Sequence, residues 1–234
     1  MEQALPKVLG ILGGLGPMAT VYFYEMLTRH TQAARDQDHI DVIINPGNTE
    51  PMYQRLLADA RLLEECGCTV IAIPCNTAHY FYDRLNETIP IPILNMVEET
   101  VLAAKAGGSA RVGILATTGT VRTRTYQRMC EKHGLPCAVP DDAAQAAVMD
   151  VIYGDIKQGR PADMAAFERA AASLRAQGCD RAILGCTELS AAFGEDRSAS
   201  ALPVVDPLDV LVLCSEMCIR DSRGPAPRQT GGNT

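Results

Sequence analysis

The chain has 234 residues, of which 47% are apolar and 21% charged, and its net charge is −7. This composition is typical of a globular protein with one large or two small domains. The acidic balance argues against a nucleic-acid or anionic-membrane partner but permits an anionic small substrate, whose site needs only local positive charge. No apolar run reaches the roughly 18 residues that span a bilayer. The N-terminal segment lacks the features of a signal peptide, so we expect a cytoplasmic protein.

Short β-branched runs alternate with segments of helical periodicity along the chain. The first group of predicted strands is 7–12, 41–45, 69–74 and 91–95, with helical patterns at 18–34 and 51–66 between them. The second group is 111–117, 137–139, 181–185 and 202–206, with helical patterns at 120–132, 143–158 and 162–177. Strands that alternate with helices, and are apolar on both faces, predict an α/β fold with parallel sheets.

The two groups resemble each other at a fixed spacing. Segment 67–75 reads GCTVIAIPC and segment 178–186 reads GCDRAILGC, an offset of 111 that also relates 92–95 to 203–206. Near the start, VLGILGG resembles RVGILAT of the second group at an offset of 103 or so. We therefore predict an internal duplication into two pseudo-symmetric halves. The predicted first half comprises 1–98 with 206–212, and the second comprises 99–205.

The end of the chain has a different composition. A closing helix is predicted to begin at Asp206-Pro207, but the segment from Arg220 onward is rich in Gly, Pro and Arg and has no apolar period. The stretch CSEMCIRDS resembles translated vector or adapter sequence. We therefore expect residues 213–234 to be a disordered tail of non-native appearance that truncates or replaces the last helix.

Two of the nine cysteines stand out against the expectation that a cysteine in a reducing compartment is a small buried hydrophobe. Cys75 and Cys186 each follow a predicted buried strand and precede a predicted helix start. The carboxyl ends of parallel strands are where open α/β sheets bind ligands. Free N–H groups and the helix dipole at these positions are expected to lower the pKa of both thiols toward neutrality.

Two equivalent thiols that face each other across a cleft suit racemisation. This reaction needs a base on one face of a carbon and an acid on the other, and the roles exchange for the opposite enantiomer. A thiol can serve in both roles because its unperturbed pKa, about 8.5, is readily tuned. Two buried structural cysteines in duplicated strand ends remain the alternative.

Four motifs carry a resemblance to a known family. GILGGLGP (10–17), PCNTAH (74–79), ATTGT (116–120) and GCTE (185–188) together resemble the aspartate/glutamate racemase family from about residue 7 to residue 211. The resemblance implies two similar α/β domains with the site between them, a small-molecule amino-acid substrate, a homodimer, and neither pyridoxal phosphate nor a metal. It also implies that Cys75 and Cys186 are the catalytic pair.

The resemblance further assigns substrate-binding positions. It places Asn76, Thr77 and Ala78 in the substrate-carboxylate loop, Thr187 at the matching place in the second half, and Lys157 at a substrate-anchoring lysine. Thr118 and Thr120, like Thr117, can offer hydroxyl and N–H groups to a carboxylate, or they are ordinary turn threonines. Lys157 without the family match would be a surface lysine. His79 either tunes Cys75 or is simply packed, and Cys68 and Cys179 are expected to fill the core.

Two cofactor sites are disfavoured by spacing. GGLGP is not the G-x-G-x-x-G of a dinucleotide site, and Cys66-Gly67-Cys68 has no second ligand pair at zinc spacing.

The substrate and the activity are open at this stage. Aspartate-specific proteins of this kind usually carry an arginine in the loop after the second strand, but here that loop, NPGNTEPMY, has none. Arg55, Arg122 or Arg124 would have to take its place, or the substrate is a different amino acid. The alternatives are a related isomerase, decarboxylase or hydantoin racemase, and a catalytically silent protein that binds small acids.

Overall fold

Two parallel sheets form the centre of the molecule. The computed structural model describes residues 7–45, 52–193, 200 and 202–220. The first sheet has the order β2-β1-β3, with β1 at Leu9–Leu12, β2 at Val42–Asn45 and β3 at Val70–Ala72. The second has the order β5-β4-β6-β7, with β4 at Val112–Ala116, β5 at Cys137–Ala138, β6 at Arg181–Gly185 and β7 at Val204–Val205. All pairs are parallel, which confirms the predicted α/β class.

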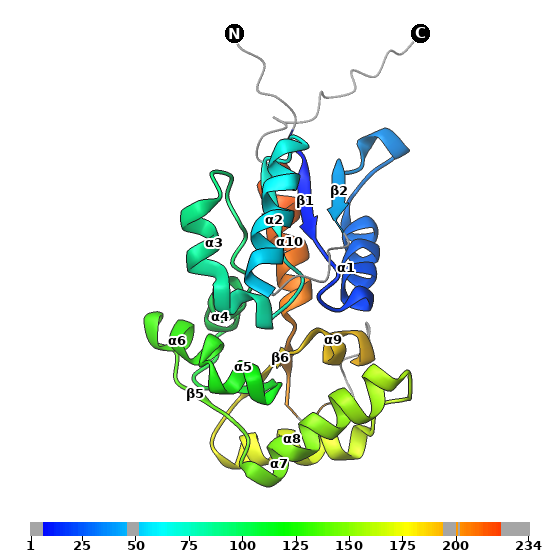
Figure 1. Ribbon diagram of the computed structural model, residues 1–234. Helices are drawn as coiled ribbons and strands as arrows, with labels where there is room; N and C mark the ends of the chain where they lie inside the picture. Colours follow the sequence, from blue (N-terminus) through cyan, green and yellow to red (C-terminus); the bar gives the residue numbers. More distant parts are fainter. Residues whose placement is uncertain (1–6, 46–51, 194–199, 201, 221–234) are drawn as a thin grey trace, which may run out of the picture.

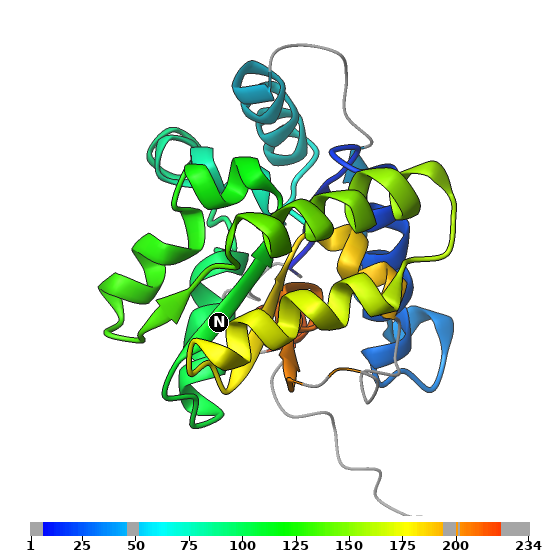
Figure 2. The same ribbon diagram turned by 90° about the horizontal axis from the view of Figure 1, so that it is seen from below.

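Helices cover both faces of each sheet (Figure 1). The helices around the first sheet are α1 (Pro17–His30), α2 (Met52–Glu65), α3 (Tyr82–Thr88) and α10 (Pro207–Arg220). Those around the second are α5 (Thr118–Arg122), α6 (Thr125–Lys132), α7 (Asp142–Met149), α8 (Met164–Ala176) and α9 (Thr187–Phe193). Short 3-10 segments lie at Asp36–Asp38 (η1), Thr77–Phe81 (η2) and Ile156–Gln158 (η4). Seen from below, α7 and α8 lie across one face of the second sheet (Figure 2).

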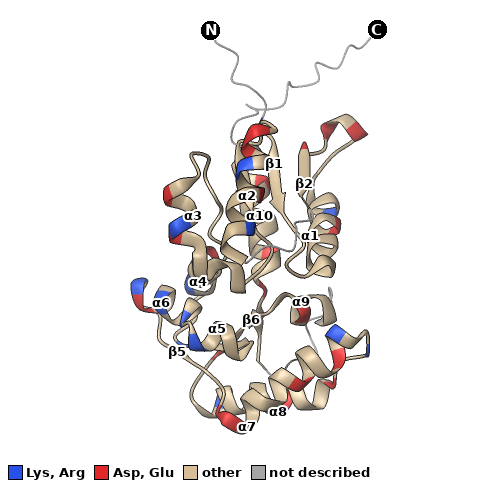
Figure 3. Cartoon of the chain, viewed as in Figure 1, with Lys and Arg blue, Asp and Glu red and all other residues tan. Residues whose placement is uncertain are grey.

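The helix α4 (Met96–Ala106) links the two halves. Met96 packs in the cluster of β1, α1 and α10, whereas Val101 packs in the cluster of β4 and α6. The predicted division at 98/99 falls inside this helix and stays a prediction. Lys and Arg residues are interspersed with Asp and Glu residues along the ribbons of both halves (Figure 3).

The register of the two sheets confirms the internal duplication. Leu9 pairs with Val70 in the first sheet and Val112 with Arg181 in the second, at the offsets of 103 and 111 that the sequence predicts. The predicted strand at 91–95 is reduced to a single bridge between Ile71 and Ile93. This bridge is the equivalent of the pairing between Ala182 and Val204 in β7. Both halves therefore have the same strand order.

Three predicted segments need correction. The helix expected at 120–132 is divided into α5 and α6 because Arg124 adopts a left-handed conformation with φ of 55°. The helix expected at 143–158 is α-helical only to Met149 and continues as a π-helix, η3 (Asp150–Asp155). The tail expected from 213 is ordered to Arg220, because Val212, Ser215 and Ile219 are buried where α10 packs on the first half. Residues 221–234 lie outside the described residues.

None of the helices in the described ranges is long and apolar enough to cross a membrane.

Candidate active site

Cys75 and Cys186 occupy equivalent positions at the carboxyl ends of β3 and β6. Cys75 leads into η2 and Cys186 into α9. The two residues are almost equally buried, with 8% and 7% of their surfaces exposed. A buried strand of the same sheet position supplies each one, so the duplication of the fold creates two matched thiols.

The turn that holds Cys75 is fixed by His79. Its Nδ1 lies 2.8 Å from the carbonyl oxygen of Cys75, and its Nε2 lies 3.1 Å from the backbone nitrogen of Met96. A backbone N–H can only donate, so Nε2 accepts and Nδ1 carries the hydrogen. Burial lowers the pKa of this imidazole, so the neutral ring ties η2 to the start of α4. Of the two sequence interpretations, the packed histidine is the one the contacts support.

The prediction that both thiols have a lowered pKa is wrong. Burial raises the pKa of Cys75, and backbone N–H groups of Ala78 and Thr77 oppose that rise. Burial raises the pKa of Cys186 well above its usual value, and the carboxylate of Glu188 raises it further. The N–H donors that the sequence predicts are present, but the loss of water around each sulfur outweighs them.

A carboxylate and an ammonium lie beside Cys186. The Cys186 thiol donates a hydrogen bond of 2.9 Å to Glu188 Oε2, and Lys157 Nζ forms an ion pair with Glu188 Oε1. The Glu188 side chain is 17% exposed and that of Lys157 33% exposed. The charges of Lys157 and Glu188 also act on Cys75. The structure thus brings Lys157 into the neighbourhood of both thiols.

Asn76, the residue after Cys75, has a side-chain N–H donor with no partner among the described residues. It is 3% exposed, and its Oδ1 accepts a hydrogen bond from the hydroxyl of Tyr126 on α6. Among the described residues its Nδ2 has no hydrogen-bond partner. A buried amide with an unused N–H costs free energy unless something binds it. Tyr126, on a helix of the second half, therefore orients the side-chain amide of Asn76, which belongs to the first half.

The threonines form a chain between the halves. The hydroxyl oxygens of Thr77 and Thr120 are 3.3 Å apart, and those of Thr120 and Thr117 are 3.1 Å apart. Thr117 also caps α5 by accepting from the N–H of Thr120. The Thr118 N–H faces the sulfur of Met149 at 3.2 Å. Thr77 and Thr120 thus lie together, while Thr118 contacts α7.

The remaining predicted positions lie on the two strand-end turns. Ala78 is completely buried in η2, and Thr187 is 5% exposed at the start of α9, where its hydroxyl lies 3.4 Å from Glu188 Oε2. The loop after β1 approaches from the other half, since a Cβ built on Gly16 would lie 3.8 Å from Glu188 Oε1.

Comparison with known proteins agrees with this architecture. The family model described as Asp/Glu/Hydantoin racemase matches residues 12–214. The chain belongs to this family. It is 27% identical over 213 residues to RacX, a broad specificity amino-acid racemase of Bacillus subtilis (strain 168), covering 85% of this chain and 92% of that one. It is 28% identical over 194 residues to a glutamate racemase of Pseudomonas aeruginosa, covering 82% and 68%.

A solved structure gives the same result. The aspartate racemase of Picrophilus torridus superposes with a TM-score of 0.73 at 27% identity, over 93% of this chain and 98% of that one. This protein is therefore a racemase of the Asp/Glu/hydantoin family.

Two residues of this candidate site are not predicted by the sequence, Tyr126 and Glu188. Tyr126 lies inside a helical pattern, and only the pairing of α6 with η2 in three dimensions brings it to Asn76. Glu188 was visible as an N-terminal helix residue, but its contact with Cys186 was not predicted. Of the three arginines considered for a substrate side chain, Arg124 pairs with Glu131, and Arg122 is exposed.

Arg55 contacts the loop at the carboxyl end of β1. Its Nη2 donates to the carbonyl oxygen of Gly13, just after β1, at 3.2 Å, and its Nε lies 3.6 Å from Asp59. Most of the predicted arginine loop, residues 46–51, falls outside the described residues.

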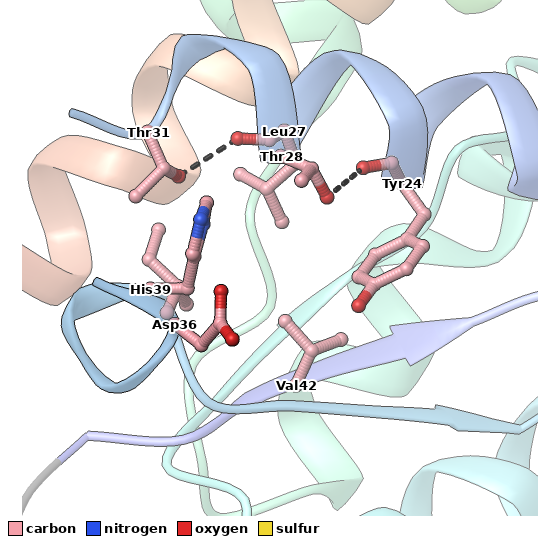
Figure 4. Close-up of a pocket in the computed structure, with 8 residues that line it drawn as sticks. Tyr24, Leu27, Thr28, Thr31, Asp36, His39 and Val42 are labelled. Carbon is pink, nitrogen blue, oxygen red and sulfur yellow. Dashed lines mark hydrogen bonds between the residues drawn. The ribbon is translucent and has the colours of Figure 1, made fainter. Parts of the chain in front are cut away.

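A separate cavity of about 290 Å³ lies at the other end of the first sheet (Figure 4). Asp36 and His39 line it together with Tyr24, and Val42, the first residue of β2, forms part of its wall. It is therefore at the amino end of β2, whereas both thiols are at the carboxyl ends of their strands. The threonine hydroxyls in this cavity already donate to helix carbonyls of α1.

Proposed function

We propose that the chain is a cofactor-independent racemase that interconverts L- and D-amino acids by moving the α-proton between Cys75 and Cys186. Aspartate and glutamate are the first substrates to test. The observation that carries the proposal is the pair of equally buried thiols at equivalent strand ends of a duplicated fold. Two structural cysteines would need neither the carboxylate and ammonium beside Cys186 nor the unused amide of Asn76 next to Cys75.

The substrate carboxylate is proposed to bind among donors that the described residues leave near the thiols. Asn76 offers its Nδ2, and the strand-end turns add the N–H and hydroxyl groups of Thr77, Ala78 and Thr187, with Thr118 and Thr120 from the second half. Lys157 supplies the positive charge that an overall acidic protein needs locally for an anionic substrate. The same groups stabilise the negative charge that develops on the carboxylate oxygens when the α-proton leaves.

Proton transfer follows a two-base scheme. One cysteine acts as a thiolate and takes the α-proton, while the opposite thiol gives its proton to the other face of the same carbon. The roles reverse for the other enantiomer. Closure of the half made of 1–98 with 206–212 onto the half 99–205 excludes water, which strengthens every charge interaction inside the site.

The names of the relatives guide the choice of substrates. They comprise a broad specificity amino-acid racemase, a glutamate racemase and an aspartate racemase. An acidic amino acid has a second carboxylate, and Arg55 is the cation that we propose to face it. We further propose that the enzyme is a cytoplasmic homodimer, as the sequence resemblance implies.

Proton NMR in D₂O tests the activity and names the substrate. The protein is incubated under reducing conditions with L-aspartate, L-glutamate and a panel of other L-amino acids. Because the opposite thiol delivers a solvent-derived deuteron, the α-proton signal of a true substrate disappears. Cys75→Ser and Cys186→Ser should each abolish this loss.

Cys68→Ser and Cys179→Ser are matched controls. These residues are also buried cysteines related by the offset of 111, but they lie before β3 and β6 and not after them. They should keep the exchange. Protein that is folded yet exchanges no α-proton from any amino acid would rule out the proposed activity.

A further inference from the structure

The two halves differ in charge at the position two residues after each thiol. The offset of 111 that relates Cys75 to Cys186 also relates Thr77 to Glu188. In the first half the threonine hydroxyl contacts Thr120 at 3.3 Å. In the second half the carboxylate of Glu188 contacts the thiol of Cys186 at 2.9 Å. A duplicated scaffold thus carries a neutral residue beside one thiol and an acid beside the other.

The hydrogen bonds around the two sulfurs also favour a thiolate at Cys75 and a thiol at Cys186. Cys75 is approached by two backbone N–H groups, those of Thr77 and Ala78, which stabilise a thiolate. Cys186 has one backbone N–H donor, that of Glu188, and itself donates to the Glu188 carboxylate. A carboxylate can accept this bond only while the sulfur keeps its proton.

The ion pair with Lys157 keeps Glu188 charged. The ammonium contacts Oε1, while Oε2 receives the thiol hydrogen. Burial raises the pKa of Glu188, but the hydrogen bonds from the Cys186 thiol and Lys157 outweigh it and lower the pKa, so this carboxyl stays ionised near neutrality. Its negative charge therefore acts on Cys186 at working pH, although the group is largely buried.

We propose that Glu188 is a positioning residue that keeps Cys186 protonated in the resting enzyme, so that Cys75 is the resting base and Cys186 the resting acid. This inference rests on the proposed function and assigns the starting roles of its two thiols. In the first turnover the Cys75 thiolate takes the α-proton, and the Cys186 thiol delivers its own proton to the opposite face. Cys186 is then a thiolate beside a carboxylate, a state that favours recovery of a proton from solvent.

Differential alkylation tests the resting roles without any need for activity. Iodoacetamide reacts with thiolates, and the two cysteines have similar residue exposures of 8% and 7%. Alkylation of the unfolded protein corrects for intrinsic reactivity, and the change of each rate with pH separates ionisation from access. Mass spectrometry with fragment spectra assigns the label to each residue. In the wild-type enzyme at pH 7.5 to 8 we expect Cys75 to react several-fold faster than Cys186. Equal rates, or a faster Cys186, would overturn the proposal, and this result needs no variant.

Glu188→Gln supplies the second test. Loss of a like charge within about 4–6 Å moves a pKa by about one unit or more, so the Cys186 rate should rise about tenfold. The charge of Glu188 also raises the pKa of Cys75, but without the direct hydrogen bond that it has to Cys186. The Cys75 rate should therefore rise by a much smaller factor, and its persistence reports that the site is folded. Glu87→Gln, an exposed carboxyl on α3, controls for the change in net charge and should leave both rates unaltered. An unchanged ratio of rates in the Glu188 variant would overturn the assignment.

The pH dependence of kcat/KM tests the role of Glu188 during turnover. Because the equilibrium constant of a racemisation is unity, kcat/KM is the same for both enantiomers, and the asymmetry must be sought in its dependence on pH. The alkaline limb reports loss of the second thiol proton. Glu188→Gln should move this limb about one unit toward lower pH, whereas a purely structural role would lower the whole profile without moving it. Complete inactivity of the wild-type enzyme would refute the proposed function but would leave the alkylation result interpretable.

Discussion

The hydrogen bond between Tyr126 and Asn76 is the contact whose removal should reveal most about how the halves make one site. Tyr126→Phe keeps the ring, which is completely buried, and removes only the hydroxyl. The amide oxygen of Asn76 then loses its donor inside the protein, while its Nδ2 already lacks a partner among the described residues. A buried polar group left unsatisfied costs about 1–3 kcal/mol. No cavity of consequence forms, so this cost is the whole expected loss.

Thermal unfolding under reducing conditions measures this loss. For a chain of this size each kcal/mol corresponds to about 2–4 °C, so Tm should fall by roughly 2–12 °C. Because Asn76 is no longer held in one orientation, KM for the substrate found by NMR should rise as well. Added substrate should then restore part of the lost Tm, since we propose that its carboxylate binds the unused amide of Asn76. A variant with the Tm and KM of the wild type would show that Tyr126 does not orient Asn76.

Three further perturbations follow from burial and packing. Ile219→Ala should lower the unfolding free energy by about 2–5 kcal/mol, measured in urea, because this α10 side chain is buried against the first half. Met217→Ala, at an exposed position of the same helix, should change it little, and equal effects would mean that α10 does not pack to its end. Gly185→Ala should cost about 1–3 kcal/mol and lower expression of soluble enzyme, because the new Cβ would lie 2.8 Å from that of Ala116. Burial raises the pKa of both active-site thiols, so kcat/KM should still rise with pH between 7 and 8.5; a flat profile from pH 6 to 8 would contradict the raised values.

The strand pattern and the duplication could be predicted because both depend on local composition. Buried parallel strands require apolar residues on both faces, and this requirement leaves a visible signature in one dimension. The offsets of 103 and 111 translate directly into equivalent pairings such as Leu9 with Val70 and Val112 with Arg181. The break at Arg124 could not be predicted in this way. An arginine carries no signal for a left-handed conformation, and hydroxyl contacts of Thr123 with the end of α5 accompany the break.

The positions of the site residues could also be predicted, but their electrostatics could not. Sequence gives the N–H donors next to Cys75 because they belong to the turn itself. It does not give the degree of burial, which depends on how the helices of both halves close over the strand ends. Burial raises the pKa of Cys75 by more than the N–H donors lower it, so the predicted direction of the shift was wrong. The end of α10 was missed for a similar reason: Ile219 belongs to a stretch of unusual sequence, yet its apolar side chain fits the first half.

A two-base racemase needs acid and base groups placed symmetrically on the two faces of the α-carbon. Only one of the two groups, however, carries a proton at the start of a turnover. The reacting pair must hold one proton between two sulfurs, because two thiols lack a base and two thiolates lack an acid. Duplication of one α/β unit supplies this geometry, since the same strand end occurs twice and each copy carries a cysteine. It would also make the two sulfurs equivalent, so that the single proton could lie on either. In the scheme that we propose, Glu188, at the position equivalent to Thr77, removes that ambiguity by keeping the proton on Cys186.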